Sequence, residues 1–169
     1  MPKPYRVGLF VRFNNAVMRS LIGAGIRIGT FAVLTVPGRK TGRPVNVPLV
    51  VFPHAGDRYF VAPYGVVNWV RNLRAADGRA ELRRGRTTEK ITAIELPPEQ
   101  AGPILRSSLQ TGPPGIPRPI LRLFRRYSVL PYLDVDMNSP DDDFVRSAVR
   151  HPVFRAQPVV ESQERPSGP

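Results

Sequence analysis

Two short segments of the sequence carry residues that could hold a cofactor. The first, GRKTGRP at residues 38–44, contains three cations and one hydroxyl beside two glycines. Glycines let the backbone approach a ligand closely, so such a turn can bind phosphate, although many basic turns are merely solvated hairpin tips. The candidate ligands in this turn are Arg39, Lys40, Thr41 and Arg43.

The second segment, APYGVVNWVRNL at residues 62–73, sets a tyrosine, two asparagines and a tryptophan around the start of a predicted helix. Backbone N–H groups at the start of a helix lack intrahelical partners and can bind anions. An ordinary interpretation fits as well, in which Trp69 anchors the helix to the core and Asn68 is its N-cap.

The rest of the sequence offers little catalytic chemistry. It has no cysteine, which excludes disulfides and thiolate catalysis, and its two histidines, His54 and His151, lack metal-ligand spacing. Asp134, Asp136 and Asn138 imitate the start of a calcium loop, but the loop's later positions do not fit, so we interpret them as a helix cap. An enzyme of this composition is expected to depend on a cofactor.

The composition is that of one globular domain with an anionic partner. The 169 residues are 41% hydrophobic and carry a formal net charge of +12, while 20 prolines argue against a helix bundle. Such a charge attracts nucleic acid, an acidic membrane surface or a polyanionic small molecule. Stacking on nucleic acid needs aromatic residues among cations, and Tyr59-Phe60 alone offers this, so we expect no specific nucleic-acid binding.

The N-terminal region is apolar but is interrupted by Arg12, Arg19 and Arg27 before a membrane-spanning length is reached. Residues 7–21 follow the spacing of an amphipathic basic helix. This helix packs on its own domain or, alternatively, makes peripheral contact with the inner face of a membrane. We expect a cytoplasmic protein.

The pattern along the chain predicts an α+β domain whose mostly antiparallel sheet curls into a small barrel. Residues 1–160 form this domain, with an N-terminal helix at 1–30, the barrel core at 31–96, and a helical region with the last strand at 97–160. Residues 161–169 are expected to be a disordered tail. The predicted strands are residues 31–36, 45–52, 58–62, 80–83, 87–95 and 132–136, and the predicted helices are 68–76, 97–109, about 120–126, and one capped by Ser139 with Pro140 at its first position.

Four segments together resemble the deazaflavin-dependent nitroreductase family. They are LTVPGRKTGRP at 34–44, GDRY at 56–59, NWVRNL at 68–73 and HPVFR at 151–155. The resemblance implies a split β-barrel of the FMN-binding type and coenzyme F-420, a deazaflavin with a phosphodiester and an oligoglutamate tail; FMN is the second choice. Val45 and Val70 depart from the family pattern, which often has arginine and tyrosine there.

The resemblance also implies a site and a reaction. Arg39 and Lys40 are expected to bind the phosphate beside Thr41 and Arg43, and a monomer or homodimer is expected to pass hydride to a quinone-like, nitroaromatic or other electron-poor small molecule. The alternative is a non-catalytic barrel that binds lipid or cofactor at a membrane surface. The remaining expected residues are Pro48, Val50, Ala62, Pro63 and Tyr64 along the ring, Asn68, Trp69 and Asn72 beside the cofactor, and Tyr127 and Tyr132 at the substrate.

Overall fold

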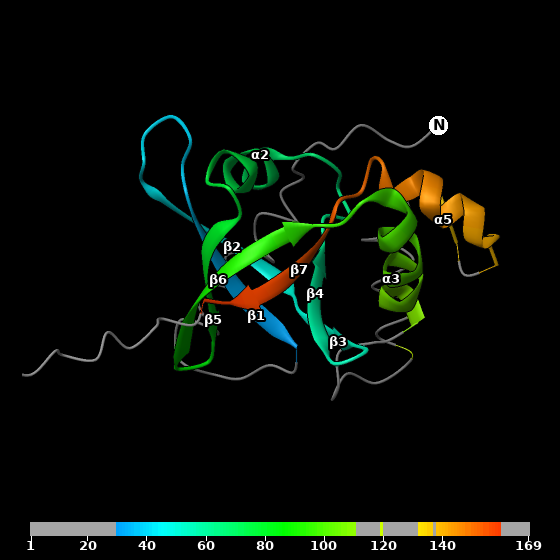
Figure 1. Cartoon of the computed structure of the whole chain (residues 1–169), viewed down its shortest axis with the longest axis horizontal. Helices are drawn as coiled ribbons and strands as arrows, with labels where there is room; N and C mark the ends of the chain where they lie inside the picture. The colour runs from blue at the N-terminus through cyan, green and yellow to red at the C-terminus, as the bar shows by residue number, and fades with distance from the viewer. Residues whose placement is uncertain (1–29, 111–118, 120–131, 137, 160–169) are drawn as a thin grey trace, which may run out of the picture.

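The computed structural model describes residues 30–110, 119, 132–136 and 138–159 (Figure 1). The predicted N-terminal helix, the predicted helix near 120–126 and the predicted tail at 161–169 lie outside the described residues. The described elements are strands β1 (Phe31–Pro37), β2 (Pro44–Val50), β3 (Phe52–His54), β4 (Asp57–Val61), β5 (Arg79–Arg84), β6 (Thr87–Glu95) and β7 (Val153–Pro158), and helices α2 (Asn68–Ala75), α3 (Pro98–Gln110) and α5 (Asp141–Ala148).

The seven strands form one antiparallel sheet that curls into a half-barrel. The strand order is β2-β1-β5-β6-β7-β4-β3, so β2 and β3 stand at opposite edges of the sheet. A single residue, Val51, separates these two strands along the chain, and β2 also approaches β4. The two edge strands therefore follow each other along the chain. The fold is the predicted split β-barrel.

The barrel interior is filled by the inward side of alternating strands. β-branched and leucine residues at every second position suit a strand with one buried face. Leu34 and Val36 of β1 face inward, opposite Leu82 of β5 and Phe154 of β7, all 1% exposed or less. Helix α2 lies against this core through Val70 and Leu73, at the upper end of the molecule beside the β1–β2 turn (Figure 1).

Helices α3 and α5 cover a second core on the other side of the sheet. Phe52 and Tyr59 of the β3–β4 hairpin pack there with Leu105 of α3 and Phe144 of α5. Gly102 lets the two helices cross closely, because a Cβ at this position would lie 2.8 Å from Cγ2 of Val145. None of the described helices is long and apolar enough to span a membrane.

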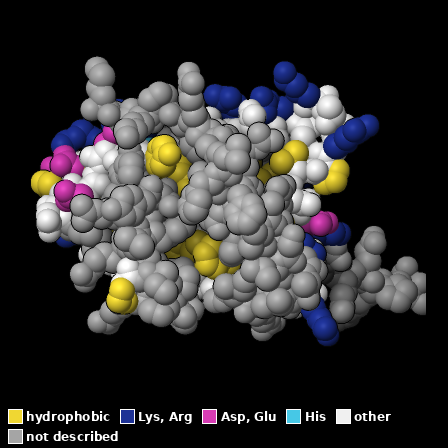
Figure 2. Space-filling model, turned by 180° about the vertical axis from the view of Figure 1, so that it is seen from behind, with side chains coloured by type: hydrophobic (Ala, Val, Ile, Leu, Met, Phe, Trp, Pro, Cys, Tyr) yellow, Lys and Arg dark blue, Asp and Glu magenta, His cyan; other side chains and the backbone are white. Residues whose placement is uncertain are grey.

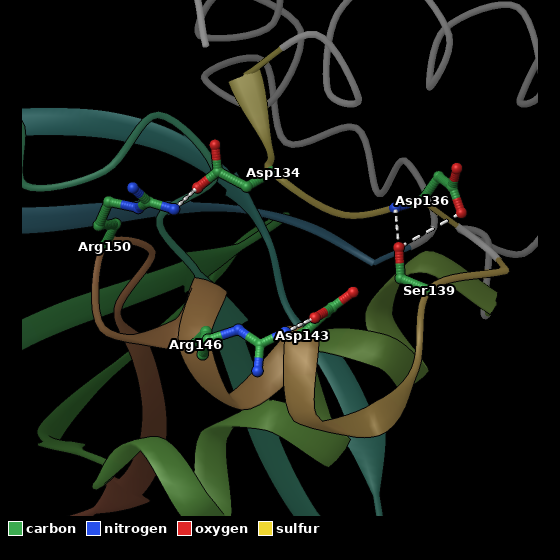
Figure 3. A network of polar contacts seen from close by, with 6 residues as sticks. All are labelled: Asp134, Asp136, Ser139, Asp143, Arg146 and Arg150. Carbon is green, nitrogen blue, oxygen red and sulfur yellow. Dashed lines mark hydrogen bonds and ion pairs between the residues drawn. The ribbon is translucent and has the colours of Figure 1, made fainter. Parts of the chain in front are cut away.

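Two predictions for the C-terminal third are wrong. Residues 132–136 do not form a strand, because polar side chains there bind the neighbouring backbone: the carboxylate of Asp136 accepts the N–H of Asn138 at 2.8 Å. The hydroxyl of Ser139 accepts the N–H of Asp136 at 2.9 Å instead of capping the helix (Figure 3), and α5 begins one residue later than predicted, after Pro140. The strand in this region is β7, which pairs with β4 and β6.

Candidate functional site

The predicted phosphate-binding turn connects β1 to β2 and is braced by its own backbone. The N–H of Gly38 donates to the carbonyl of Arg43 at 2.9 Å, and the carbonyl of Gly38 accepts the N–H groups of Thr41 and Gly42 at 3.2 and 2.7 Å. Gly42 has a φ of +68°, a conformation that favours glycine. Because three amides of the turn are used internally, its capacity to bind an anion lies mainly in its side chains.

Helix α2 fixes one of these side chains. Asn72 is buried, with 6% of its surface exposed, and its Oδ1 accepts both the backbone N–H of Arg39 at 3.3 Å and Nη1 of Arg39 at 2.8 Å. Two predicted site residues 33 positions apart are thus brought into direct contact. A guanidinium carries five N–H groups, so the remaining ones can serve a ligand.

The cations of this turn are not neutralised by the described part of the chain. No described carboxylate pairs with Arg39, Lys40 or Arg43, whereas Arg58 pairs with Glu89 and Arg74 with Glu95. Figure 2 shows Lys and Arg side chains gathered at the end of the molecule from which the β1–β2 turn projects. This turn therefore offers an exposed positive charge to an anion. Thr41 supports the turn, since its hydroxyl accepts the N–H of Arg43 at 3.4 Å.

Trp69 lies at the rim of the barrel core. Its indole is half-buried and packs against Phe60 and Phe154, with ring centroids 6.1 and 5.9 Å apart. The tryptophan therefore anchors α2 and still leaves part of its ring accessible. Asn68 is exposed and is not the N-cap, which is Val67 without a side-chain hydrogen bond.

The predicted apolar wall comes from two neighbouring parts of the barrel. Pro48 and Val50 are half-buried on β2, which approaches β4, and Ala62 follows directly after β4. The ring of Tyr64 meets that of Tyr132 edge to face, with centroids 5.1 Å apart at 83°. Tyr64, predicted along the ring, and Tyr132, predicted at the substrate, are thus in contact. Tyr127, the other residue predicted at the substrate, lies outside the described residues.

His151 was not among the expected site residues, and Asp134 was expected only as part of a helix cap. The imidazole of His151 is buried behind Ala62 and Pro63, and its Nε2 lies 3.9 Å from Oδ2 of Asp134. Burial lowers the pKa of His151, and this effect outweighs the opposing influence of the Asp134 carboxylate and the backbone of Ala62 and Pro63. The HPVFR segment was the available signal, since its histidine stands two residues before the first residue of β7.

Two solved structures illustrate what the chain is similar to. It shares 19% sequence identity with an F420-H2 dependent reductase (FDR-A), with 76% of this chain and 94% of that chain covered and a TM-score of 0.46. It shares 20% identity with a structure described as a domain-swapped dimer, with 88% of this chain and 97% of that chain covered and a TM-score of 0.49. No curated protein matches the chain.

The family assignment comes from the sequence. The family model described as F420H(2)-dependent quinone reductase matches residues 10–115, which is more than half of the chain. The matched region includes the cationic β1–β2 turn and the whole of α2. The chain therefore belongs to the F420H(2)-dependent quinone reductase family and is an oxidoreductase that uses coenzyme F-420.

Proposed function

We propose that this protein passes a hydride from reduced coenzyme F-420 to a small electron-poor acceptor of the quinone or nitroaromatic class. In this proposal the β1–β2 turn binds the phosphate of the coenzyme through Arg39 and Lys40, with Arg43 beside them. The deazaflavin ring lies along residues 48–50 and 62–64 next to Trp69. The acceptor lies on the side of Tyr64 and Tyr132.

The observation that carries the proposal is the contact between Arg39 and Asn72. A buried amide oxygen holds an exposed guanidinium over α2, and no described carboxylate competes for it or for the neighbouring cations. The phosphate and glutamate groups of the coenzyme form a polyanion that complements these cations, because arginine forms bidentate hydrogen bonds with phosphate and carboxylate groups. The residues present therefore fit the coenzyme.

The roles of the site residues follow from their surroundings. The bound coenzyme supplies the hydride. Pro48 and Val50, both half-buried, offer an apolar surface that excludes water from one face of the site, while Ala62 is buried in the barrel core with 1% of its surface exposed. Hydride transfer needs such a dry, well-oriented surface more than it needs an acid or base. The half-buried indole of Trp69, which packs against the same core, adds a further apolar surface.

The experiment that tests this proposal removes charge from two turns of the same protein. The Arg39→Ala/Lys40→Ala variant loses the proposed phosphate ligands. Its matched control, Arg84→Ala/Arg86→Ala, loses the same net charge from the β5–β6 turn, where no described carboxylate pairs with either arginine. Binding of F-420 is measured by fluorescence titration at low and high salt, with FMN as comparison.

Charge-assisted hydrogen bonds contribute about 1.5–3 kcal/mol each, so we expect at least about tenfold weaker binding for Arg39→Ala/Lys40→Ala. Binding that remains should depend less on salt than in the wild type. The control should bind within about twofold of the wild type, and FMN should bind more weakly than F-420. Equal weakening in both double variants would contradict the proposed phosphate site.

Three further expectations from the sequence stay predictions. One domain over residues 1–160 can be tested by limited proteolysis, and a monomer or homodimer by light scattering. Peripheral membrane contact through residues 7–21 predicts sedimentation with acidic vesicles that is lost when these residues are deleted. Retained sedimentation after the deletion would rule out this helix as the contact.

A further inference from the structure

A buried polar cluster behind the proposed ring-binding wall has no part in the function proposed above. The imidazole of His151 has 7% of its surface exposed, and its Nε2 lies 3.9 Å from Oδ2 of Asp134. Its Nδ1 is buried and has no hydrogen-bond partner among the described residues. The same carboxylate pairs with Arg150 (Figure 3). Burying a titratable ring is costly, so its position here calls for a reason.

The His151 side of the cluster is attached to the segment that carries Tyr64. The carbonyl of Pro152 accepts the N–H of Ala62 at 2.9 Å, and the backbone of Ala62 and Pro63 adjoins the imidazole. Gly65 has a φ of +74°, and a Cβ there would lie 3.1 Å from the carbonyl oxygen of Arg150. The connection from β4 to α2 is therefore packed directly on the two residues that precede Pro152.

The Asp134 side of the cluster is attached to the segment that carries Tyr132. Asp134 follows Tyr132 by two positions, in a stretch without regular secondary structure. Such a stretch has no ladder of backbone hydrogen bonds to fix it, so its position depends on side-chain contacts. Leu133 and Val135 pack into the second core, and Asp134 between them pairs with Arg150 and lies 3.9 Å from His151, just after α5.

We propose that Asp134 and His151 are positioning residues for the acceptor pocket. Asp134 pairs with Arg150, whose carbonyl packs against Gly65, and the neighbouring imidazole of His151 adjoins the backbone of Ala62 and Pro63. The cluster thereby ties the Tyr132 segment to the Ala62–Tyr64 segment and maintains the edge-to-face contact of the two tyrosine rings. The inference rests on the proposed function in one respect, that these rings line the acceptor site. The tie itself does not depend on the coenzyme.

The charged groups that face His151 determine how pH acts on this tie. They are the Asp134 carboxylate, from the segment before α5, and the Arg150 guanidinium, from the turn after α5. The loop after β4 contributes the uncharged backbone of Ala62 and Pro63. Burial favours the neutral imidazole. Acidification towards the lowered pKa therefore forces a charge into the cluster and loosens the contact between the rings.

The test combines a measurement on the rings with steady-state kinetics of the full chain. Nuclear Overhauser effects between Tyr64 and Tyr132 are recorded in the wild type from pH 8 to pH 5, and in the His151→Gln and Asp134→Asn variants at pH 7.5. The KM for menadione, a simple quinone, and the affinity for F-420 are measured for the same proteins. His54→Gln is the matched control, since His54 contacts Ser107 of α3 and lies outside this cluster.

We expect the ring-to-ring signal to weaken in both variants and in the acidified wild type. The KM for menadione should rise at least threefold in both variants, while F-420 affinity stays within twofold and His54→Gln matches the wild type in every measurement. An unchanged ring-to-ring signal in the variants and at pH 5 would overturn the inference. A loss of F-420 affinity in the variants as large as the rise in the KM for menadione would also overturn it. A wild type that shows the ring contact but reduces neither menadione nor nitrobenzene, a simple nitroaromatic compound, would instead contradict the proposed function. If a variant fails to fold, the wild-type pH series decides.

Discussion

The contact between Arg39 and Asn72 gives a prediction whose size follows from its two hydrogen bonds. Replacing Asn72 with alanine removes the acceptor for the backbone N–H and for Nη1 of Arg39. A neutral hydrogen bond contributes about 1 kcal/mol and one to a charged group about 1.5–3 kcal/mol, but the exposed Arg39 regains water, so we expect a net loss of about 1–2 kcal/mol. The turn then loses its fixed position over α2.

The effect on coenzyme binding is smaller than that of deleting the cations. Immobilising one flexible side chain on binding costs about 0.5–1.5 kcal/mol, which is the cost that Asn72 removes in advance. We therefore expect F-420 to bind roughly two- to tenfold more weakly to Asn72→Ala, as measured by fluorescence titration. Asn46→Ala is the matched control. It removes an asparagine acceptor from the β1–β2 hairpin that carries Arg39, but Asn46 accepts from Thr35 and not from Arg39.

A double-mutant cycle separates this contact from general damage to the helix. Urea unfolding of Asn72→Ala, Arg39→Ala and the double variant gives their coupling energy, which we expect to be about 1 kcal/mol. Losses that simply add, within about 0.3 kcal/mol, would refute the reasoning that Asn72 acts through Arg39.

Two further variants test other parts of the fold. Gly102→Ala should lower the free energy of unfolding by about 1–3 kcal/mol and reduce the melting temperature, because the new methyl group meets Val145 at 2.8 Å, whereas Gln110→Ala at the exposed end of the same helix should change little. Wild-type stability should fall as pH drops below about 6.5, with a slope of at most about 1.4 kcal/mol per pH unit from His151, because the folded state resists protonation of an imidazole whose pKa burial has lowered. His151→Gln should flatten this part of the urea-denaturation profile, and an unchanged slope would show that another group titrates there.

The local elements of the barrel could be predicted because their signals are local. Apolar and β-branched runs ended by glycine or proline predicted β1, β2, β4, β5, β6 and α2 within about two residues. The short strand β3 was not predicted, because residues 45–52 were assigned to one strand and His54 to the turn after it. The strand β7 was missed, since VFRAQP is short and ends in proline, and residues 132–136 were misassigned because alternating apolar residues there compete with aspartates that bind the local backbone.

The site itself depends on contacts between distant positions. Arg39 meets Asn72 and Tyr64 meets Tyr132, yet neither pair has a spacing that a helix or a single hairpin imposes. The family resemblance named these residues without saying which of them touch. The internal hydrogen bonds of the β1–β2 turn were also invisible in the sequence, which suggested a backbone cradle where the structure offers side chains.

The single residue between β2 and β3 has a consequence for how the protein can change. Val51 is 1% exposed, and its N–H donates to the carbonyl of Thr30 at 2.8 Å, so the strand turns from one edge of the barrel to the other without a loop. Inserting or deleting one residue here would reverse which side chains of β3 face inward. It would also shift both edge strands, β2 and β3, relative to each other. This corner is therefore expected to keep its length over evolution.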